Sequence, residues 1–151
     1  MSSYLNVVVA LTNFAAYVPL CALWYQRDYT TWSCLVFLAT FSFVSHLYES
    51  HKHGMKGFGT PVFVSYLLNR LDVLGCVLLG LRGSYLWYYE FWPFPTQLVV
   101  AGCALICLGV SEYDKYNPKR RTLYVVCHSI WHVLAYLWLG QYLWCLERLE
   151  K

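Results

Sequence analysis

Two histidines lie four residues apart, His128 and His132, inside the apolar stretch YVVCHSIWHVLAYLWLGQYLWCL (124–146). Residues at positions i and i+4 lie on the same face of a helix, so both imidazoles point the same way. Ionisable side chains are costly inside hydrocarbon and usually functional there. The spacing therefore predicts a ligand site on an apolar helix. Taken alone, the pair is more typical of two buried histidines that are hydrogen-bonded between helices.

Other polar groups in apolar runs can reach the same depth. Ser42 and His46 share one helical face, and Asp72 lies in the run 62–81. With a rise of about 1.5 Å per residue, His46, Asp72 and the histidine pair lie roughly 12–21 Å from one membrane face. Three imidazoles and a nearby carboxylate are the ligand set of a catalytic zinc site with one position open for water. We expect Asp72 to orient that water or take its proton.

Several alternatives stay open for these residues. Imidazole also suits iron or cobalt, and His46 could share a haem with one histidine of the pair, which would leave the other histidine unexplained. Asp72 could form an ion pair with Arg70 or cap a neighbouring polar group. The Ser42 hydroxyl could instead bond to the backbone of its own helix.

The composition indicates a membrane protein. The chain has 151 residues, of which 59% are hydrophobic and only 13% are charged. A soluble domain of this length cannot bury so much apolar surface, which predicts a single integral membrane domain over residues 1–151. The net charge of +3 is too small and dispersed for a nucleic-acid partner. The seven cysteines lie in apolar stretches without a CxxC pair, so we expect small buried side chains without disulfides.

Apolar runs and breakers predict an all-α, polytopic transmembrane bundle of about five spans. The spans are expected at about 4–25, 31–50, 62–81, 97–112 and 118–146. The first run contains Pro19 as a kink candidate. It lacks a basic leader and a cleavage site, so it is expected to be a retained span.

The loops have their own expectations. In HKHGMKGFGTP, His51 and His53 are expected to be solvated, with a second metal site as the minority reading. Asn117 should cap a helix that begins at Pro118, within a loop facing lipid headgroups. The aromatic segment 82–96 is expected to anchor at the membrane interface, by lipid or partner contact.

Five antiparallel crossings divide the cations between two membrane faces. The N-terminal face should carry six cations and the opposite face four, which favours an N-terminus on the inside. The six are Lys52, Lys56, Lys115, Lys119, Arg120 and Arg121, and the four are Arg27, Arg82, Arg148 and Lys151.

Taken together, Ser42-x3-His46, LDVLG around Asp72, and HSIWH resemble the CREST superfamily of membrane hydrolases. That group includes alkaline ceramidases, adiponectin- and progestin-type receptors, GPI-remodelling phospholipases and a myomaker-like branch, to which HLYE and HSIWHVL are most similar. The resemblance covers roughly residues 31–146. It implies that the three histidines bind zinc, that Asp72 holds the water on the metal, and that Ser42 supports the site or the oxyanion. The implied chemistry is hydrolysis of lipid amides or esters.

The chain departs from that superfamily in length. CREST members have seven spans, whereas the roughly 55 residues between Asp72 and His128 leave room for one good span. Removing two spans preserves parity, so His128 still enters from the correct face, and we expect a shortened CREST-like seven-helix fold.

Two functions follow from these expectations. The first is a zinc-dependent hydrolase of membrane lipids, which requires an open cavity beside the histidines. The second is a non-catalytic accessory subunit of a larger membrane complex, for example a mitochondrial respiratory or ATP synthase complex, which keeps the metal as a structural clip. A clip requires a sealed site or a fourth protein ligand. The expected locations are the mitochondrial inner membrane or the endoplasmic reticulum.

Overall fold

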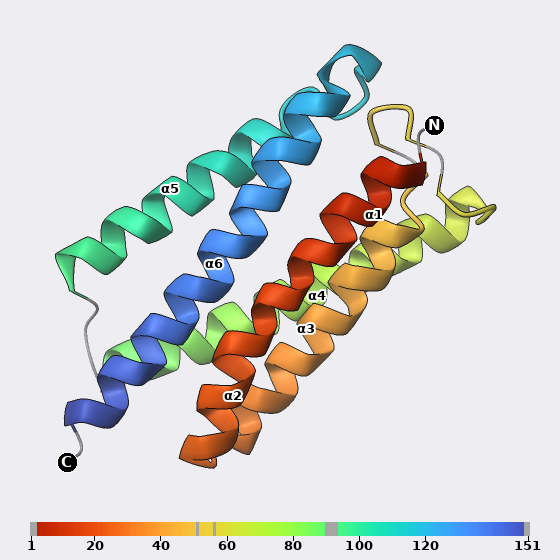
Figure 1. The fold of residues 1–151 in the computed structure, drawn as a ribbon. Coiled ribbons are helices and arrows are strands. Elements are labelled where there is room, and N and C mark those ends of the chain that lie inside the picture. Colours follow the sequence, from red (N-terminus) through yellow and green to blue (C-terminus); the bar gives the residue numbers. More distant parts are fainter. Residues whose placement is uncertain (1–2, 51, 56, 90–93, 150–151) are drawn as a thin grey trace.

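The computed structural model describes residues 3–50, 52–55, 57–89 and 94–149, and over these residues the chain is helical without strands (Figure 1). The elements are α1 (Ser3–Leu11), the 3₁₀ turn η1 (Thr12–Ala16), α2 (Tyr17–Gln26), α3 (Tyr29–Leu47), α4 (Val62–Tyr89), α5 (Pro95–Glu112), the 3₁₀ turn η2 (Pro118–Arg120) and α6 (Arg121–Leu149). Five segments are long and apolar enough to cross a membrane: Tyr4–Gln26, Tyr29–Leu47, Val62–Tyr88, Pro95–Glu112 and Pro118–Cys145. The prediction of an all-α chain with five helices of spanning length is confirmed.

The first span changes helix type near its middle. The turn η1 interrupts the α-helix just before Pro19, which lies in the first turn of α2. Proline has no N–H to donate to the carbonyl four residues earlier, and its ring crowds that carbonyl. The expected irregularity is therefore present, and it lies in the turn that precedes the proline.

Two helix boundaries differ from the sequence prediction. Helix α3 ends at Leu47 instead of residue 50, and α4 continues to Tyr89 instead of ending at residue 81. Residues 82–89 of the predicted aromatic segment therefore extend the helix, because no proline interrupts them. Their role as an interfacial anchor stays a prediction. Nε of Arg82 donates to the Thr31 hydroxyl, in the first turn of α3, at 2.9 Å. Residues 90–93 of the same predicted anchor lie outside the described part of the chain.

The helices form two pairs joined by the N-terminal rod. Helix α3 packs on α4, α5 packs on α6, and the rod α1–η1–α2 contacts both α3 and α6 (Figure 1). Within the described segments, the backbone of α4 does not approach that of α5 or α6, although Trp87 of α4 packs edge-on against Trp138 of α6, with ring centroids 5.7 Å apart. An added Cβ at Gly75 would lie 2.8 Å from the Cα of Leu38, so a glycine is needed where α3 and α4 cross.

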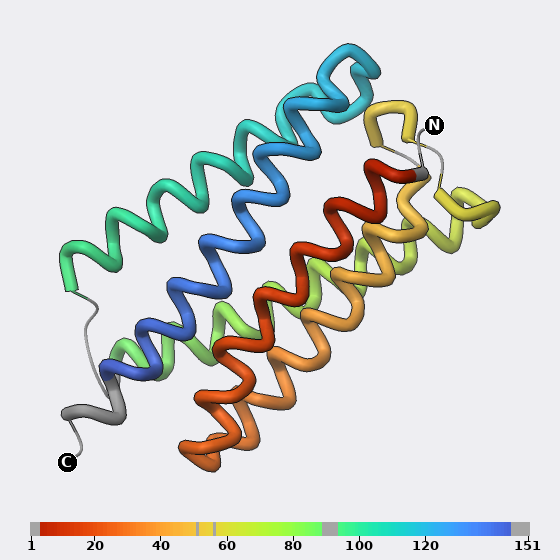
Figure 2. Tube along the Cα trace, in the orientation of Figure 1, coloured from red at the N-terminus to blue at the C-terminus, as the bar shows by residue number. Residues whose placement is uncertain are grey.

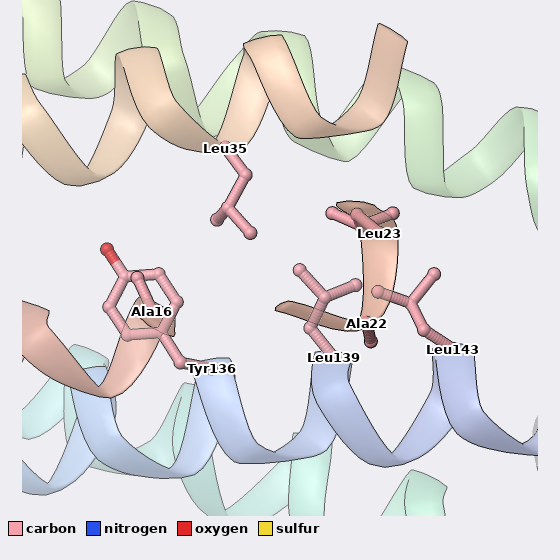
Figure 3. Close-up of a cluster of buried hydrophobic side chains, with 7 residues drawn as sticks. All are labelled: Ala16, Ala22, Leu23, Leu35, Tyr136, Leu139 and Leu143. Atoms are coloured by element: carbon pink, nitrogen blue, oxygen red, sulfur yellow. The ribbon is translucent and has the colours of Figure 1, made fainter. Parts of the chain in front are cut away.

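A hydrophobic cluster fills the space between the rod, α3 and α6 (Figure 3). Its buried members are Ala16, Ala22, Leu23, Leu35, Tyr136, Leu139 and Leu143. Lipid tails are as apolar as these side chains, so in a bilayer van der Waals packing holds such a cluster together. The cluster therefore fixes the rod against one helix of each pair.

The N-terminal end of α1 and two loops meet at one end of the bundle, as the five-crossing topology predicts. Figure 2 shows α6 ending at the opposite end. The N–H of His53 donates to the carbonyl of Lys115 at 2.6 Å, and Arg121 donates to the carbonyl of His53 at 3.0 Å. Asn6 donates to the carbonyls of His46 and Glu49 at 3.0 and 2.8 Å.

Several expectations about the loops and surface need correction. His53 is fully buried against the Tyr124 ring, so the prediction of a solvated residue is wrong for it, and His51 lies outside the described residues. Lys52 is also buried and paired with carboxylates, so it is no free loop cation. Asn117 caps the next turn as predicted, accepting from the N–H of Lys119 at 3.0 Å, but that turn is 3₁₀.

The cysteines were expected to be buried, and this is wrong. All seven are free thiols, and each is exposed or half-buried. Cys76 lines the cavity, and the other six lie on exposed or half-buried faces of their helices instead of in the packed core.

Candidate metal centre

Three imidazoles converge from two helices that belong to different pairs. His46 lies in the last turn of α3, and His128 and His132 lie one turn apart on α6. The ring centroids are 4.7 to 4.9 Å apart, and one ligand nitrogen from each residue lies within 4.8 Å of the others. Each side chain is at most 5% exposed. In the described part of the chain, this is the one group of three or more potential ligands that could hold a metal ion.

The two histidines of α6 have their ring orientation set by hydroxyl groups. Nδ1 of His132 lies 2.8 Å from the hydroxyl of Thr12, and Nδ1 of His128 lies 2.9 Å from the hydroxyl of Ser111. Each hydroxyl donates its only proton to a carbonyl of its own helix, at 2.6 and 2.7 Å. The hydroxyls therefore accept from Nδ1–H, which leaves the lone pair of each ring on Nε2. The Ser42 hydroxyl lies 3.5 Å from Nε2 of His132.

A carboxylate plays the same part for His46. Nδ1 of His46 lies 3.3 Å from Glu49, and the hydroxyl of Tyr124 donates to the same carboxylate at 2.5 Å. A carboxylate can only accept, so His46 donates from Nδ1. Its Nε2 is buried without a hydrogen-bond partner among the described residues. This outer contact through Nδ1, with Nε2 left free, is the usual arrangement of metal-binding histidines.

Buried charges surround the histidines. Lys52 bridges Glu49 and Glu112 at 3.5 and 2.8 Å, and Glu112 lies 3.8 Å from Nδ1 of His128. Burial by itself would raise the pKa of Glu49, but Lys52, His46 and Tyr124 hold it at about 2. Burial works against the charged form of Lys52, yet the two carboxylates raise the pKa of Lys52 above its usual value.

One carboxyl group beside the histidines has no cationic side chain as a partner in the described part of the chain. Lys52 pairs with Glu49 and Glu112, whereas Asp72 lies 3.9 Å from Nε2 of His46. Buried charges require compensation, because the desolvation cost of each ion is several kcal/mol. A metal cation among the three histidines would lie beside this carboxyl group.

The other two predicted site residues lie beside the histidines. Oδ2 of Asp72 lies 3.9 Å from Nε2 of His46, and the hydroxyl of Ser42 lies 3.5 Å from Nε2 of His132. Asp72 forms no ion pair with Arg70 within the described ranges, so that alternative is not observed. The haem alternative also fails, because rings with centroids 4.7 and 4.9 Å apart leave no room for a porphyrin between them.

A cavity of about 740 Å³ opens beside the cluster. Its walls come from α3, α4, α5 and α6, and all five predicted site residues line it: Ser42, His46, Asp72, His128 and His132. Helices α4 and α5 both contribute wall residues without packing on each other, so the wall between them is incomplete. The histidines therefore adjoin a space that a ligand can reach from the side of the bundle.

The surrounding residues were missed at the sequence level. Glu49 follows His46 by three residues and Tyr124 precedes His128 by four, so helical spacing could have suggested both. Thr12 and Ser111 carry no such signal, because a lone hydroxyl in an apolar run usually bonds to its own backbone. Both do so here, and the histidines use the remaining acceptor capacity.

Comparison with known proteins identifies a similar protein, "Uncharacterized protein L282" from Acanthamoeba polyphaga mimivirus. It is 42% identical over 138 residues, with 84% of this chain and 88% of the relative covered. No protein-family model matches the chain. No solved structure matches it.

Proposed function

The chain belongs to the same family as this mimivirus protein, and from its own side chains we propose that it is an integral membrane metalloprotein. His46, His128 and His132 would hold a divalent ion, with zinc as the favoured metal. We include in the proposal a shortened CREST-like bundle, supported by the meeting of these histidines with Ser42 and Asp72.

The observation that carries the proposal is the orientation of the three rings. Nδ1 of His46 faces a carboxylate, and Nδ1 of His128 and of His132 each face a hydroxyl whose proton is bonded to a carbonyl. Nδ1 of His132 also has a longer contact of 3.4 Å with the side-chain amide nitrogen of Asn13. With the proton of each ring on Nδ1, each Nε2 carries the lone pair. Zinc takes nitrogen ligands in tetrahedral geometry, and a catalytic site uses three protein ligands. The chemistry and number of the donors therefore fit zinc, and the cavity adjoins the position left open.

The activity supported best is hydrolysis of a lipid amide or ester. A zinc ion, when bound, supplies a Lewis acid for the carbonyl and a water of near-neutral pKa. The cavity beside the cluster is lined mainly by apolar side chains of α4, α5 and α6, which suits an acyl chain.

The chain's own residues would manage the protons and the charge. As the oxygen of water bonds to the carbonyl carbon, Oδ2 of Asp72 accepts the proton of that water. The hydroxyl of Ser42 donates a hydrogen bond to the oxyanion that develops. When the C–N or C–O bond breaks, Asp72 returns its proton to the leaving amine or alkoxide.

The accessory subunit is the second candidate, and it rests on the carboxylate of Asp72. At 3.9 Å from Nε2 of His46, that carboxylate is close enough to become a fourth metal ligand after a small movement. Four protein ligands would make a closed, structural site. The cavity beside the histidines favours the hydrolase, because a structural clip has no use for it.

Metal analysis of the purified protein tests the shared premise. We expect about one zinc ion per chain in the wild type and none in a variant with His46→Ala, His128→Ala and His132→Ala. His53→Ala is the matched control, because His53 is a buried histidine outside the cluster. Equal metal content in the triple variant and the control would refute the site.

Asp72→Asn separates the two functions. If Asp72 is the proton acceptor, the variant keeps its metal and loses hydrolysis of a panel of fluorescent lipid amides and esters. If Asp72 is a fourth ligand, the variant loses metal, and the metal-loaded wild type hydrolyses none of these lipids. The second result would exclude the hydrolase.

A further inference from the structure

Two cations without ionic partners line the same cavity as the histidines. Arg70 lies on α4 and Lys115 lies in the turn after α5. Neither side chain forms an ion pair with any residue that the structure describes, whereas Lys52, the third cation of the wall, is neutralised by Glu49 and Glu112. The ammonium group of Lys115 instead lies over the Tyr116 ring, 5.5 Å from its centroid.

The two cations lie close to the same pair of tyrosines. Tyr66 of α4 interacts with Tyr116, and it lies within electrostatic range of both Lys115 and Arg70. Tyr66 precedes Arg70 by four residues and shares its helical face. The tyrosines therefore bring α4 and the turn after α5 together at this end of the cavity, with a positive charge contributed from each side.

An unpaired arginine at this position is expensive. Arg70 lies eight residues after the start of α4, about 12 Å along the helix. A guanidinium group inside an apolar span needs an anion or a route to water. Its planar fork matches two oxygens of a phosphate, and a lysine adds a point charge to the same group.

Other charged groups of the wall leave the two cations free for a ligand. Glu112 lies near Lys115 in sequence, but its carboxylate is held by Lys52 at 2.8 Å. The carboxylate of Asp72 is directed towards His46, at 3.9 Å. The end of the cavity formed by Arg70 and Lys115 thus keeps a surplus positive charge.

We infer that the cavity binds an acyl lipid with a phosphate-bearing headgroup, whose phosphate lies between Arg70 and Lys115. The acyl chain runs along the apolar wall of α4 and α5, past residues such as Val77, Gly80 and Leu105. The evidence for this binding site is the cavity and the two cations that line it. It deepens the proposed function by naming a substrate class, and only the cleavage of the bound lipid rests on that function.

Lipid binding by the purified protein in detergent tests the inference. The probes are dioctanoyl phosphatidate, dioctanoylglycerol and inorganic phosphate, with affinities measured by native mass spectrometry. We expect the wild type to bind phosphatidate at least about tenfold more tightly than the neutral lipid. Inorganic phosphate should compete only weakly, because it lacks the acyl chains that the apolar wall buries.

A matched pair of double variants locates the charge effect. The double variant with Arg70→Gln and Lys115→Gln should bind both lipids with about equal affinity, since neither cation remains at this end of the cavity. Lys119→Gln with Arg120→Gln removes the same charge at the same end of the bundle, from residues that do not line the cavity. This control should keep the wild-type preference.

The possible results test the lipid-binding site independently of the proposed metal site. Equal affinity of the wild type for both lipids overturns it, and this comparison needs no variant. An equal loss of preference in the two double variants also overturns it, in favour of general surface attraction. If phosphate alone competes as well as phosphatidate, the ligand is a free anion and the lipid assignment fails. If the wild type keeps the preference for phosphatidate but contains no metal and hydrolyses none of the lipids, the lipid site stands although the catalytic proposal has failed.

Discussion

The two sides of the histidine cluster are built differently. On the closed side, the rod α1–η1–α2 packs against both helix pairs, and Thr12 contacts Nδ1 of His132. On the open side, α4 and α5 line a cavity without packing on each other. Thr12 of the closed side orients His132, Ser111 of α5 orients His128, and the cavity on the open side gives access to the rings. Residues of the cavity wall away from Ser111 can therefore be altered with little effect on the orientation of the rings.

Polar contacts accumulate on the closed side for a physical reason. Inside an apolar bundle, a buried donor or acceptor without a hydrogen-bond partner costs roughly 1–3 kcal/mol. The side-chain amide of Asn6 donates to the carbonyls of His46 and Glu49, at the end of α3 and just after it. The side chain of Asn13 accepts from the Tyr136 hydroxyl at 2.9 Å. The open side has glycines instead, and an added Cβ at Gly80 or Gly83 would meet nothing within 4 Å.

The largest effect should come from removing one of the metal-binding histidines, which lie between the closed side and the open side. His132→Ala leaves only two nitrogen ligands, so metal content should fall from about one ion per chain to near zero. Elemental analysis of the purified variant measures this. His132→Ala with unchanged metal content would show that the cluster is merely a hydrogen-bonded core.

A smaller effect should come from the groups that orient the rings. Glu49→Gln and Ser111→Ala each change the partner of one Nδ1, and they should weaken metal binding by about 10–100-fold. Competition with a chelator of known affinity gives the constants. Ser33→Ala is the control, because its hydroxyl bonds only to the backbone of α3 on the exposed surface. A loss in the control as large as in Ser111→Ala would contradict the orienting role.

Filling the open side should reduce lipid binding but leave the metal in place. Gly80→Phe puts a ring into the cavity, and we expect roughly tenfold weaker binding of an acyl lipid. Gly102→Phe is the matched control, since a Cβ there also meets nothing within 4 Å and Gly102 does not line the cavity. Metal content and lipid affinity are measured on both variants. Equal lipid affinity in the two would show that the ligand does not use this wall.

The smallest effect should come from the far end of the bundle. Asp28 caps α3 by accepting from the N–H of Thr31 at 3.0 Å and pairs with Arg82 at 3.2 Å. Asp28→Ala should lower the free energy of unfolding by about 1 kcal/mol, because a helix cap is lost. Metal content should not change. Thermal unfolding in detergent, with Ser33→Ala as the reference, measures the difference.

The same residue predicts a pH dependence. Burial would raise the pKa of Asp28, but bonds from Thr31 and the charge of Arg82 lower it below its usual value. A carboxyl group with a lowered pKa in the folded state stabilises above the unfolded pKa of about 3.9, and its contribution is lost as the pH falls through the folded value. Asp28→Asn should therefore reduce the acid sensitivity of unfolding. An unchanged acid transition would show that the cap contributes little.

Much of the fold followed from hydropathy, and the errors have local causes. The spans were located because apolar runs of that length are helical in a membrane. The end of α4 was misplaced because Tyr85, Trp87 and Tyr88 are typical of an interface, whereas here the helix continues through them. Trp87 even lines the cavity. His53 was misjudged because its burial depends on Lys115 and Tyr124, which are distant in the sequence.

The sequence alone determined which residues could form the site. Helical periodicity is a property of the local chain, so the spacing of Ser42 with His46 and of His128 with His132 places each pair on one face. The tertiary structure decided which nitrogen of each ring is free and which side of the cluster is open. That information depends on partners such as Thr12 and His132, which lie 120 residues apart and meet only when the rod packs against α6.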